Sequence, residues 1–347
     1  MSTDRPLVLL WPAPQSRDRI FDPATLTRLH TRFDVVDFES APDAAGPPAR
    51  FDELFDELLP SAFAVIGQPD LPAERLERAT ALRALVNVEG NFFPNVDYPT
   101  AFRRGVRVLG CGPAYADAVA EMSLALALDL ARGISREDRA FREGREQYVA
   151  ANTADSVLLR RSTVGLIGFG NLGRSLHRLL LAFDPTIRVY DPWLPAAILV
   201  DQGVIPATLE ETLDSQFVFV LATVTEASRR LLGPAELDLL PPGARLILVS
   251  RAAVVDYDAL LERVAAGRFL AAVDVWPEEP LAADHPARRL EGLVLSPHRA
   301  GGIPQAFTSI GEMVCDDLEL IASGLPPARM QIAAAELVGR YRNRPVG

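Results

Sequence analysis

The feature that most constrains this chain is a glycine-spaced turn in residues 164–176, which read VGLIGFGNLGRSL. A short apolar run leads into Gly168, Gly170 and Gly173, spaced G-x-G-x-x-G, and a leucine-rich segment with helical spacing follows. The first glycine permits a tight strand-to-helix turn, the second lets a pyrophosphate approach the backbone, and the third lets helix and strand pack closely. The helix N-terminus then faces the phosphates. The spacing predicts a dinucleotide-binding turn, with a glycine-rich turn that binds nothing as the alternative.

Asp191 ends the next strand-like segment, IRVYD, at a spacing from Gly173 close to the ~20 residues typical of the acidic residue that binds the ribose. A 2′-phosphate beside this carboxylate would meet a repulsion of about 4 kcal/mol at ~4 Å and an effective dielectric constant of ~20. Pro192 and Trp193 follow, so no arginine stands next to Asp191. We therefore expect NAD rather than NADP, with a helix-capping role for Asp191 as the alternative.

Composition excludes several other classes of protein. A hydrophobic fraction of 49% excludes a disordered chain, and a length of 347 residues favours two domains. The net charge of −11, without basic runs, disfavours nucleic acid as a partner. The chain contains no lysine, which excludes Schiff-base catalysis and a Walker A phosphate loop.

The sequence shows no pattern typical of a membrane span, a signal peptide or a metal site. No apolar run approaches the ~20 residues that a membrane span needs, and the charged N-terminus does not resemble a signal peptide. Cys111 and Cys315 offer neither a disulfide framework nor zinc-ligand spacing, so we expect buried thiols and no metal. We expect a cytoplasmic protein without a membrane partner.

Short, continuous apolar runs alternate with helix-like segments along the chain, which is typical of parallel strands buried on both faces. The runs are residues 7–11, 63–67, 84–88, 106–109, 164–168, 187–190, 217–222, 245–250, 270–275 and 293–296. Helical spacing is expected at 74–85, 117–134, 256–267 and 303–323, and the residues from 329 onward form a tail of uncertain role. The order of elements predicts an α/β fold with two doubly wound domains. Because the glycine turn lies in the second of these domains, we expect that domain to bind the nucleotide.

Polar residues follow three strand-like runs of this second domain, where an open α/β sheet binds its ligand. Arg251 follows RLILVS, Asp274 lies in LAAVDVWPEEP with Glu279 shortly after, and His298 follows LVLSP. A solvated loop charge or a turn residue is the ordinary explanation for each residue alone. Their common position at the ends of successive strands instead favours a catalytic site.

Together these segments resemble the D-isomer-specific 2-hydroxyacid dehydrogenase family, from about residue 60 to about residue 325. The matching segments are VEGNFFPNVD (88–97), DAVAE (117–121), GFGNLG (168–173), YDP (190–192), VSRAAVVDYDAL (249–260), VDVWPEEPL (273–281) and SPHRAGG (296–302). The resemblance implies a Rossmann NAD-binding domain at 118–299. It is inserted into a discontinuous, flavodoxin-like substrate-binding domain built from 1–117 and 300–347.

The resemblance also implies the roles of the site residues. His298 is the acid/base, Glu279 is its carboxylate partner, and Arg251 binds the carboxylate and carbonyl of a small 2-keto or 2-hydroxy acid. These roles suit the residue types, because histidine changes charge near neutral pH and the planar arginine fork matches a carboxylate. The implied substrate-binding residues are Gly90, Asn91, Phe92, Arg251 and His298. The implied NAD-binding residues are Gly168, Gly170, Asn171, Leu172, Gly173, Asp191, Pro192, Thr223, Ser250, Asp274 (which would hold the nicotinamide carboxamide), His298 and Gly301.

The sequence departs from the family pattern mainly in the substrate loop, where the usual G-x-G reads Gly90-Asn91-Phe92. Phe92, Phe93, Tyr115 and Trp276 suggest a more aromatic substrate pocket, or else belong to the ordinary core. The sequence does not name the substrate.

Two functions remain open. One is an NAD-dependent oxidoreductase that forms a homodimer through its nucleotide-binding domains. The other is an NAD-sensing regulatory or scaffold protein of the corepressor type on the same fold.

Overall fold

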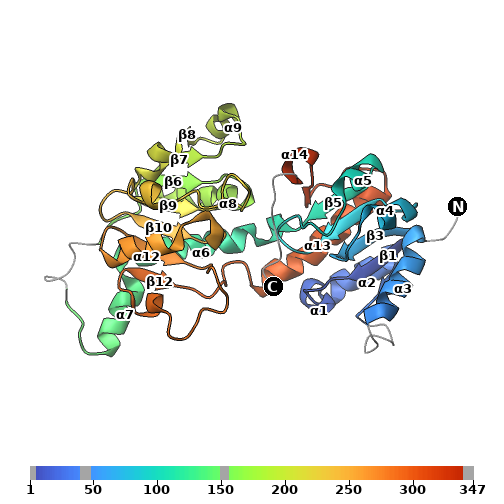
Figure 1. Ribbon diagram of the computed structural model, residues 1–347, viewed down its shortest axis with the longest axis horizontal. Helices are drawn as coiled ribbons and strands as arrows, with labels where there is room; N and C mark the ends of the chain where they lie inside the picture. Colours follow the sequence, from blue (N-terminus) through green and yellow to red (C-terminus); the bar gives the residue numbers. More distant parts are fainter. Residues whose placement is uncertain (1–4, 40–47, 149–155, 339–347) are drawn as a thin grey trace. The chain divides into compact units, whose positions relative to one another are not determined.

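The structure, a computed structural model, describes residues 5–39, 48–148 and 156–338 and divides into two compact units. Unit 1 combines residues 1–115 with residues 303–347, and unit 2 is formed by residues 116–302. Figure 1 shows the red helix α13 (Pro304–Ala322) packed among the blue elements of unit 1. Residues 339–347, the end of the predicted tail, lie outside the described residues.

Unit 1 contains a six-stranded sheet in the order β13-β5-β4-β3-β1-β2. Its parallel strands are β1 (Leu7–Trp11), β2 (Asp34–Asp37), β3 (Ala62–Gly67), β4 (Ala84–Asn87) and β5 (Arg107–Gly110). The order 2-1-3-4-5 is the doubly wound arrangement typical of flavodoxin-like domains. The edge strand β13 (Gln331–Ile332) pairs antiparallel with β5, which the sequence had not indicated.

Helices cover both faces of the unit 1 sheet, and β1 shows why its strands are continuously apolar. Val8 and Leu10 belong to the apolar cluster that includes residues of α13, whereas Leu9 belongs to a second cluster that includes Phe55 of α3. Because successive side chains point to opposite faces, a strand covered on both sides must be apolar throughout. Besides α13, the helices of unit 1 are α1 (Arg17–Ile20), α2 (Pro23–Arg32), α3 (Pro48–Leu58), α4 (Ala73–Arg78), α5 (Tyr98–Arg103) and α14 (Ala335–Val338).

Unit 2 contains a seven-stranded parallel sheet in the order β12-β11-β10-β9-β6-β7-β8. The strands are β6 (Thr163–Ile167), β7 (Thr186–Tyr190), β8 (Ile205–Pro206), β9 (Phe217–Val220), β10 (Arg245–Leu248), β11 (Leu270–Val273) and β12 (Leu293–Leu295). The strand order reverses between β6 and β9, because β7 and β8 are added on one side of β6 and β9 to β12 on the other, and such a switch point is where doubly wound sheets bind ligands. Two parallel α/β sheets confirm the predicted fold class.

The helices of unit 2 differ from the predicted boundaries in places. They are α7 (Ile134–Arg142), α8 (Asn171–Leu180), α9 (Ala196–Asp201), α10 (Leu209–Leu213), α11 (Pro234–Leu237) and α12 (Tyr257–Ala265). The long helix α6 (Gly112–Arg132) begins earlier than expected and ends before Gly133, whose positive φ of 66° interrupts it ahead of α7. The helix expected at 74–85 ends at Arg78, because the chain must turn to begin β4 at Ala84.

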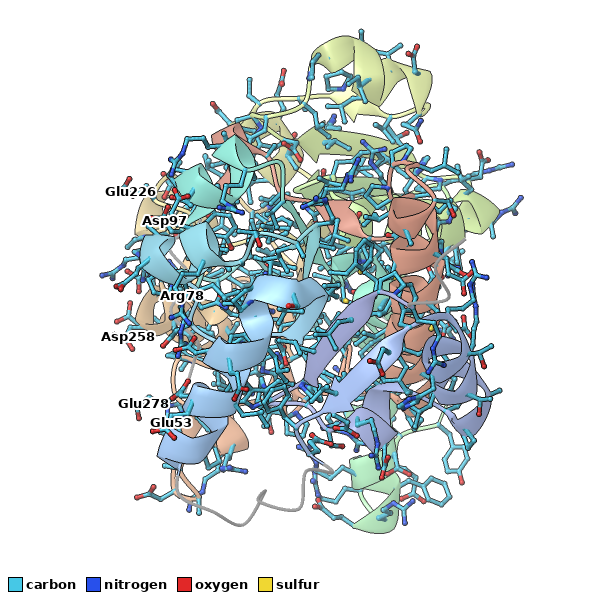
Figure 2. All side chains as sticks on the ribbon, turned by 90° about the vertical axis from the view of Figure 1, so that its right-hand side faces the viewer. Glu53, Arg78, Asp97, Glu226, Asp258 and Glu278 are labelled. Carbon is cyan, nitrogen blue, oxygen red and sulfur yellow. The ribbon has the colours of Figure 1, made fainter. Side chains whose placement is uncertain are left out.

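Burial follows the polarity of the side chains. Cys111 and Cys315 are buried free thiols, as predicted, and burial raises the pKa of both. Charged side chains such as Glu53, Arg78 and Glu278 are exposed (Figure 2). Within the described ranges, no helix is long and apolar enough to cross a membrane.

Candidate active site

The glycine turn adopts a conformation in which each glycine is needed for a different reason. Gly168 has φ +95°, and a Cβ there would lie 2.9 Å from the backbone nitrogen of Ala222. A Cβ on Gly173 would lie 2.6 Å from the carbonyl oxygen of Gly168, so helix α8 and the turn are too close for any side chain. A Cβ on Gly170 would meet nothing within 4 Å, which leaves open space at the N-cap of α8. This geometry fits a dinucleotide pyrophosphate at the helix N-terminus.

Asp191 follows β7 and reaches back to the glycine turn. Its Oδ2 accepts a 2.8 Å hydrogen bond from the backbone amide of Phe169, and its Oδ1 accepts a 3.0 Å bond from the amide of Trp193. A carboxylate has about four acceptor positions, so these two bonds leave acceptor capacity for ribose hydroxyls. Asp191 thus shapes the turn as well as presenting a negative charge beside it.

The other residues implied to bind NAD lie at the same edge of the unit 2 sheet. Asn171 and Leu172 form the first turn of α8, Pro192 follows β7, and Thr223, Ser250 and Gly301 follow β9, β10 and β12. The Ser250 side chain is buried, and its hydroxyl has no hydrogen-bond partner in the described part of the chain. A buried hydroxyl without a partner suits a site that a ligand completes.

Glu279 and His298 are in direct contact. Oε2 of Glu279 lies 2.7 Å from Nδ1 of His298, and Oε1 of Glu279 accepts a 2.9 Å hydrogen bond from the backbone amide of Trp276. With a carboxylate at Nδ1, that nitrogen carries a proton, and Nε2 is the atom left for proton exchange. The His298 side chain is 45% exposed, so it is accessible to a substrate.

Asp274 holds the loop that carries His298. Its side chain is fully buried, and its carboxylate accepts hydrogen bonds from the backbone amides of Arg299 (2.8 Å) and Ala300 (2.9 Å). The Ser296 hydroxyl donates to the same carboxylate. His298 itself has φ +53°, an uncommon conformation for a side chain other than glycine, so its backbone requires such support.

Ser296 and Trp276 support this site, although their residue types alone do not indicate it. The indole Nε1 of Trp276 donates a 2.9 Å hydrogen bond to the carbonyl oxygen of Ser296, while the backbone amide of Trp276 holds Glu279. Both residues lie inside the matched segments, but backbone and hydroxyl contacts leave no signature in residue type.

Tyr257 packs beneath the acidic residues. Its hydroxyl donates to the carbonyl oxygen of Val275 at 2.7 Å, and its ring centroid lies 5.6 Å from that of Trp276. Burial raises the pKa of Tyr257, and the charges of Glu279 and Asp274 raise it further. Tyr257 therefore stays protonated and acts as a structural donor.

Arg251 follows β10, Glu279 follows β11 and His298 follows β12, which are adjacent strands in the sheet. The guanidinium of Arg251 donates a 2.7 Å hydrogen bond from Nη1 to the carbonyl oxygen of Ser250. The candidate site of unit 2 thus combines an arginine with a carboxylate–histidine contact at the edge that carries the glycine turn.

The loop implied to bind substrate, Gly90–Phe92, follows β4 in unit 1. The ring of Phe92 is only 4% exposed and belongs to the apolar core, where it packs against Gly110. Trp276 is also a core residue, at 8% exposure. For these two aromatics the structure favours the core alternative over an aromatic substrate pocket.

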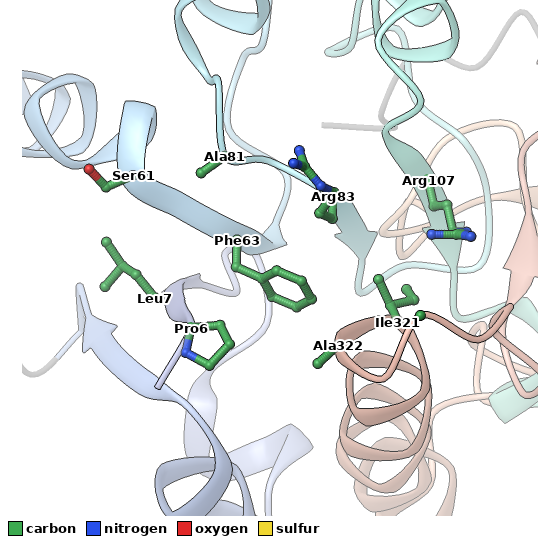
Figure 3. Close-up of a pocket in the computed structure, with 10 residues that line it drawn as sticks. Pro6, Leu7, Ser61, Phe63, Ala81, Arg83, Arg107, Ile321 and Ala322 are labelled. Atoms are coloured by element: carbon green, nitrogen blue, oxygen red, sulfur yellow. The ribbon is translucent and has the colours of Figure 1, made fainter. Parts of the chain in front are cut away.

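A cavity of about 530 Å³ lies in unit 1, away from this loop. Figure 3 shows its lining residues, which include Leu7, Arg83 and Arg107. These residues stand at or just before the amino ends of β1, β4 and β5, whereas Gly90 follows the carboxyl end of β4. The cavity is therefore at the opposite edge of the sheet from the substrate loop.

Comparison with known proteins agrees with this geometry. Residues 124–300 match the family described as D-isomer specific 2-hydroxyacid dehydrogenase, NAD binding domain. The crystal structure of a phosphoglycerate oxidoreductase from Rhizobium etli is 44% identical, with a TM-score of 0.84, and the match covers 95% of this chain and 99% of that chain.

Relatives compared by sequence carry related names. The glyoxylate reductase of Thermofilum pendens is 28% identical over 89% of this chain and 92% of its own length. The D-3-phosphoglycerate dehydrogenase of Archaeoglobus fulgidus is also 28% identical, over 76% of this chain but only 50% of its own length, so this chain spans about half of that relative. From the family match and the Rossmann unit that carries it, we conclude that the chain belongs to the D-isomer-specific 2-hydroxyacid dehydrogenase family of NAD-dependent oxidoreductases.

Proposed function

We propose that this protein interconverts a small 2-keto acid and the corresponding 2-hydroxy acid, with NAD(H) as cofactor and His298 as the acid/base. The observation that carries the proposal is the 2.7 Å contact between Glu279 and Nδ1 of His298. The names of two relatives, glyoxylate reductase and hydroxypyruvate reductase, support a small acid as substrate.

The proposed chemistry needs a hydride and a proton. NADH, which the glycine turn and Asp191 would hold, would supply the hydride. His298 donates the proton from Nε2 to the carbonyl oxygen, and Glu279 stabilises the positive charge on the imidazole before the transfer. Arg251 binds the substrate carboxylate and polarises the carbonyl. Hydride and proton together yield the hydroxyl group, and the reverse sequence oxidises the 2-hydroxy acid.

Two further roles come from the family resemblance and remain proposals. The backbone amides of Gly90 and Asn91 would receive the substrate carboxylate, and Asp274 would hold the nicotinamide carboxamide. In the described part of the chain, Oδ2 of Asp274 accepts a hydrogen bond only from the Ala300 amide, which leaves acceptor capacity for an amide donor.

We also propose a homodimer that forms through unit 2. Helix α7 exposes Ile134 (58%) and Phe141 (61%), and Leu158 (69%) beyond it is also exposed. Exposed apolar side chains gathered on one segment are typical of protein–protein contacts, and symmetric pairs are the commonest oligomers. A cytoplasmic location remains a prediction from the sequence.

A turnover assay tests the proposed function. NADH oxidation is followed with a panel that contains glyoxylate, hydroxypyruvate, pyruvate and phosphohydroxypyruvate. The proposal predicts saturable turnover of at least one of these acids. If the protein binds NADH and turns over no 2-keto acid, the NAD-sensing alternative is correct instead.

A further inference from the structure

Glu89 is a carboxylate beside the loop proposed to receive the substrate. It follows β4, directly precedes Gly90, and is half-buried. Its Oε1 accepts a 2.7 Å hydrogen bond from Nε2 of Gln15. In the described part of the chain Glu89 forms no ion pair, so its negative charge is not neutralised by an arginine.

The contact with Gln15 shows where the Glu89 side chain goes. Gln15 follows β1, and β3 lies between β1 and β4 in the sheet, so the hydrogen bond spans the carboxyl edge of the sheet across the end of β3. The neighbouring backbone is fixed at the same edge, because the amide of Val88 donates to Oε1 of Gln68 at 3.1 Å. Glu89 is thus held along the edge from which the substrate loop emerges.

The other side of the loop is closed by an aromatic ring. A Cβ on Gly90 would lie 3.6 Å from the ring of Tyr115, and the Tyr115 hydroxyl donates to the carbonyl oxygen of Val88 at 3.2 Å. A Cβ at that distance would make an ordinary van der Waals contact, so the ring packs against position 90 and supports the loop. Glu89, which directly precedes Gly90 in the sequence, is the ionisable residue that adjoins this loop.

We propose that Glu89 determines which 2-keto acids the protein accepts, according to the charge of the substrate side chain. An ionised carboxylate only accepts hydrogen bonds, and it repels anions. It therefore disfavours substrates with a second anionic group, such as a phosphate or a second carboxylate, and favours a side chain with a hydroxyl or cationic donor. The inference rests on the proposed function.

The test is a selectivity measurement on the full-length protein. We would determine kcat/KM with NADH for glyoxylate, hydroxypyruvate, phosphohydroxypyruvate, oxaloacetate and 2-keto-5-guanidinopentanoate. Each value is divided by the value of the same variant for glyoxylate, which has no side chain. The variants are Glu89→Gln, which removes the charge at constant shape, and Glu89→Asp, which keeps it. Glu74→Gln is a matched control at an exposed position of unit 1.

We expect the wild type to prefer hydroxypyruvate and the guanidino acid over phosphohydroxypyruvate and oxaloacetate. Glu89→Gln should raise the normalised values for the two anionic substrates by about tenfold or more, because one repulsive charge is lost. Glu89→Asp and Glu74→Gln should retain the wild-type order. Unchanged ratios in a folded Glu89→Gln protein, as judged by its thermal unfolding, would overturn the role of Glu89. A wild type that reduces no acid of the panel, glyoxylate included, would overturn the proposed function itself.

Discussion

The backbone amide of His298 donates a 2.7 Å hydrogen bond to the carbonyl oxygen of Asp274, so the acid/base candidate is tied directly to the end of β11. The Asp274 carboxylate holds the next two amides of the same loop. Through these bonds the fully buried Asp274 holds the loop in which His298 has a positive φ, and Glu279 contacts the His298 ring. The geometry of the pair thus depends on Asp274 as well as on its own two members.

Asp191 should set the preference for NADH. Its carboxylate lies beside the glycine turn and would repel the 2′-phosphate of NADPH. We expect kcat/KM to be at least about tenfold higher with NADH than with NADPH in the wild type. Asp191→Ala should lose most of this preference and also raise KM for NADH, because the amides of Phe169 and Trp193 lose their acceptor. The exposed control Asp201→Ala should behave as the wild type, and equal use of both cofactors by the wild type would show that Asp191 does not select.

Glu279→Gln should lower kcat for keto-acid reduction. A neutral amide is a weaker partner for Nδ1 of His298 than a carboxylate, so kcat should fall while the dissociation constant for NADH stays close to the wild-type value. The measurement is kcat at one pH for the wild type, Glu279→Gln and the exposed neighbour Glu278→Gln, which should match the wild type. An unchanged kcat in Glu279→Gln would refute the pairing as a functional one.

The fold could be predicted well from the sequence, because the strands that build it are apolar on both faces. The ten apolar runs all contain strands of the structure. The missed strands have a common reason. β8 and β13 have two residues each, too few for any periodicity, and β2 reads DVVD, with an aspartate at either end.

The residues of the candidate site could be selected from residue type and position, but the residues that support them could not. Motif spacing was enough to select Glu279 and His298, since both follow strands of the nucleotide-binding sheet. The bond of Trp276 to Glu279 and the bond of Ser296 to Asp274 depend on a backbone amide and on a hydroxyl, which the sequence pattern does not mark. The burial of the Phe92 ring in the core likewise depends on the space left by the missing side chain of Gly110, which the sequence pattern does not show.

His177 should make the stability of the protein depend on pH. It is 6% exposed, its Nε2 has no partner in the described residues, and its ring centroid lies 5.7 Å from that of Phe169 in the glycine turn. Burial lowers the pKa of His177, and the charge of Arg178 lowers it further. The unfolded chain therefore binds a proton at a higher pH than the folded protein does. The free energy of unfolding should fall as the pH decreases below the ordinary histidine range near ~6.5.

Urea unfolding at pH 7.5 and pH 5.5 measures this effect. The loss of stability between the two should be smaller in His177→Leu than in the wild type, because the variant has no group to protonate there. His30→Gln, which changes an exposed histidine, should lose as much as the wild type. Equal losses in all three proteins would show that His177 is not responsible.

Helix α7 should hold the proposed dimer together. The wild type is expected to sediment at about twice the chain mass of 37.7 kDa, and Phe141→Asp should shift it to the monomer because a charge would be buried at the contact. Leu181→Asp, at an equally exposed apolar residue outside α7, serves as the control and should remain dimeric. A wild type that is monomeric at micromolar concentration would end this proposal.

The most direct test of the account is the rate of keto-acid reduction by His298→Ala. If His298 donates the proton, kcat should fall by roughly 10²–10⁴, the usual worth of general acid catalysis. The dissociation constant for NADH, measured by fluorescence, should stay close to the wild-type value, because the glycine turn and Asp191 are unchanged. A His298→Ala protein that keeps the wild-type kcat would contradict the proposed mechanism.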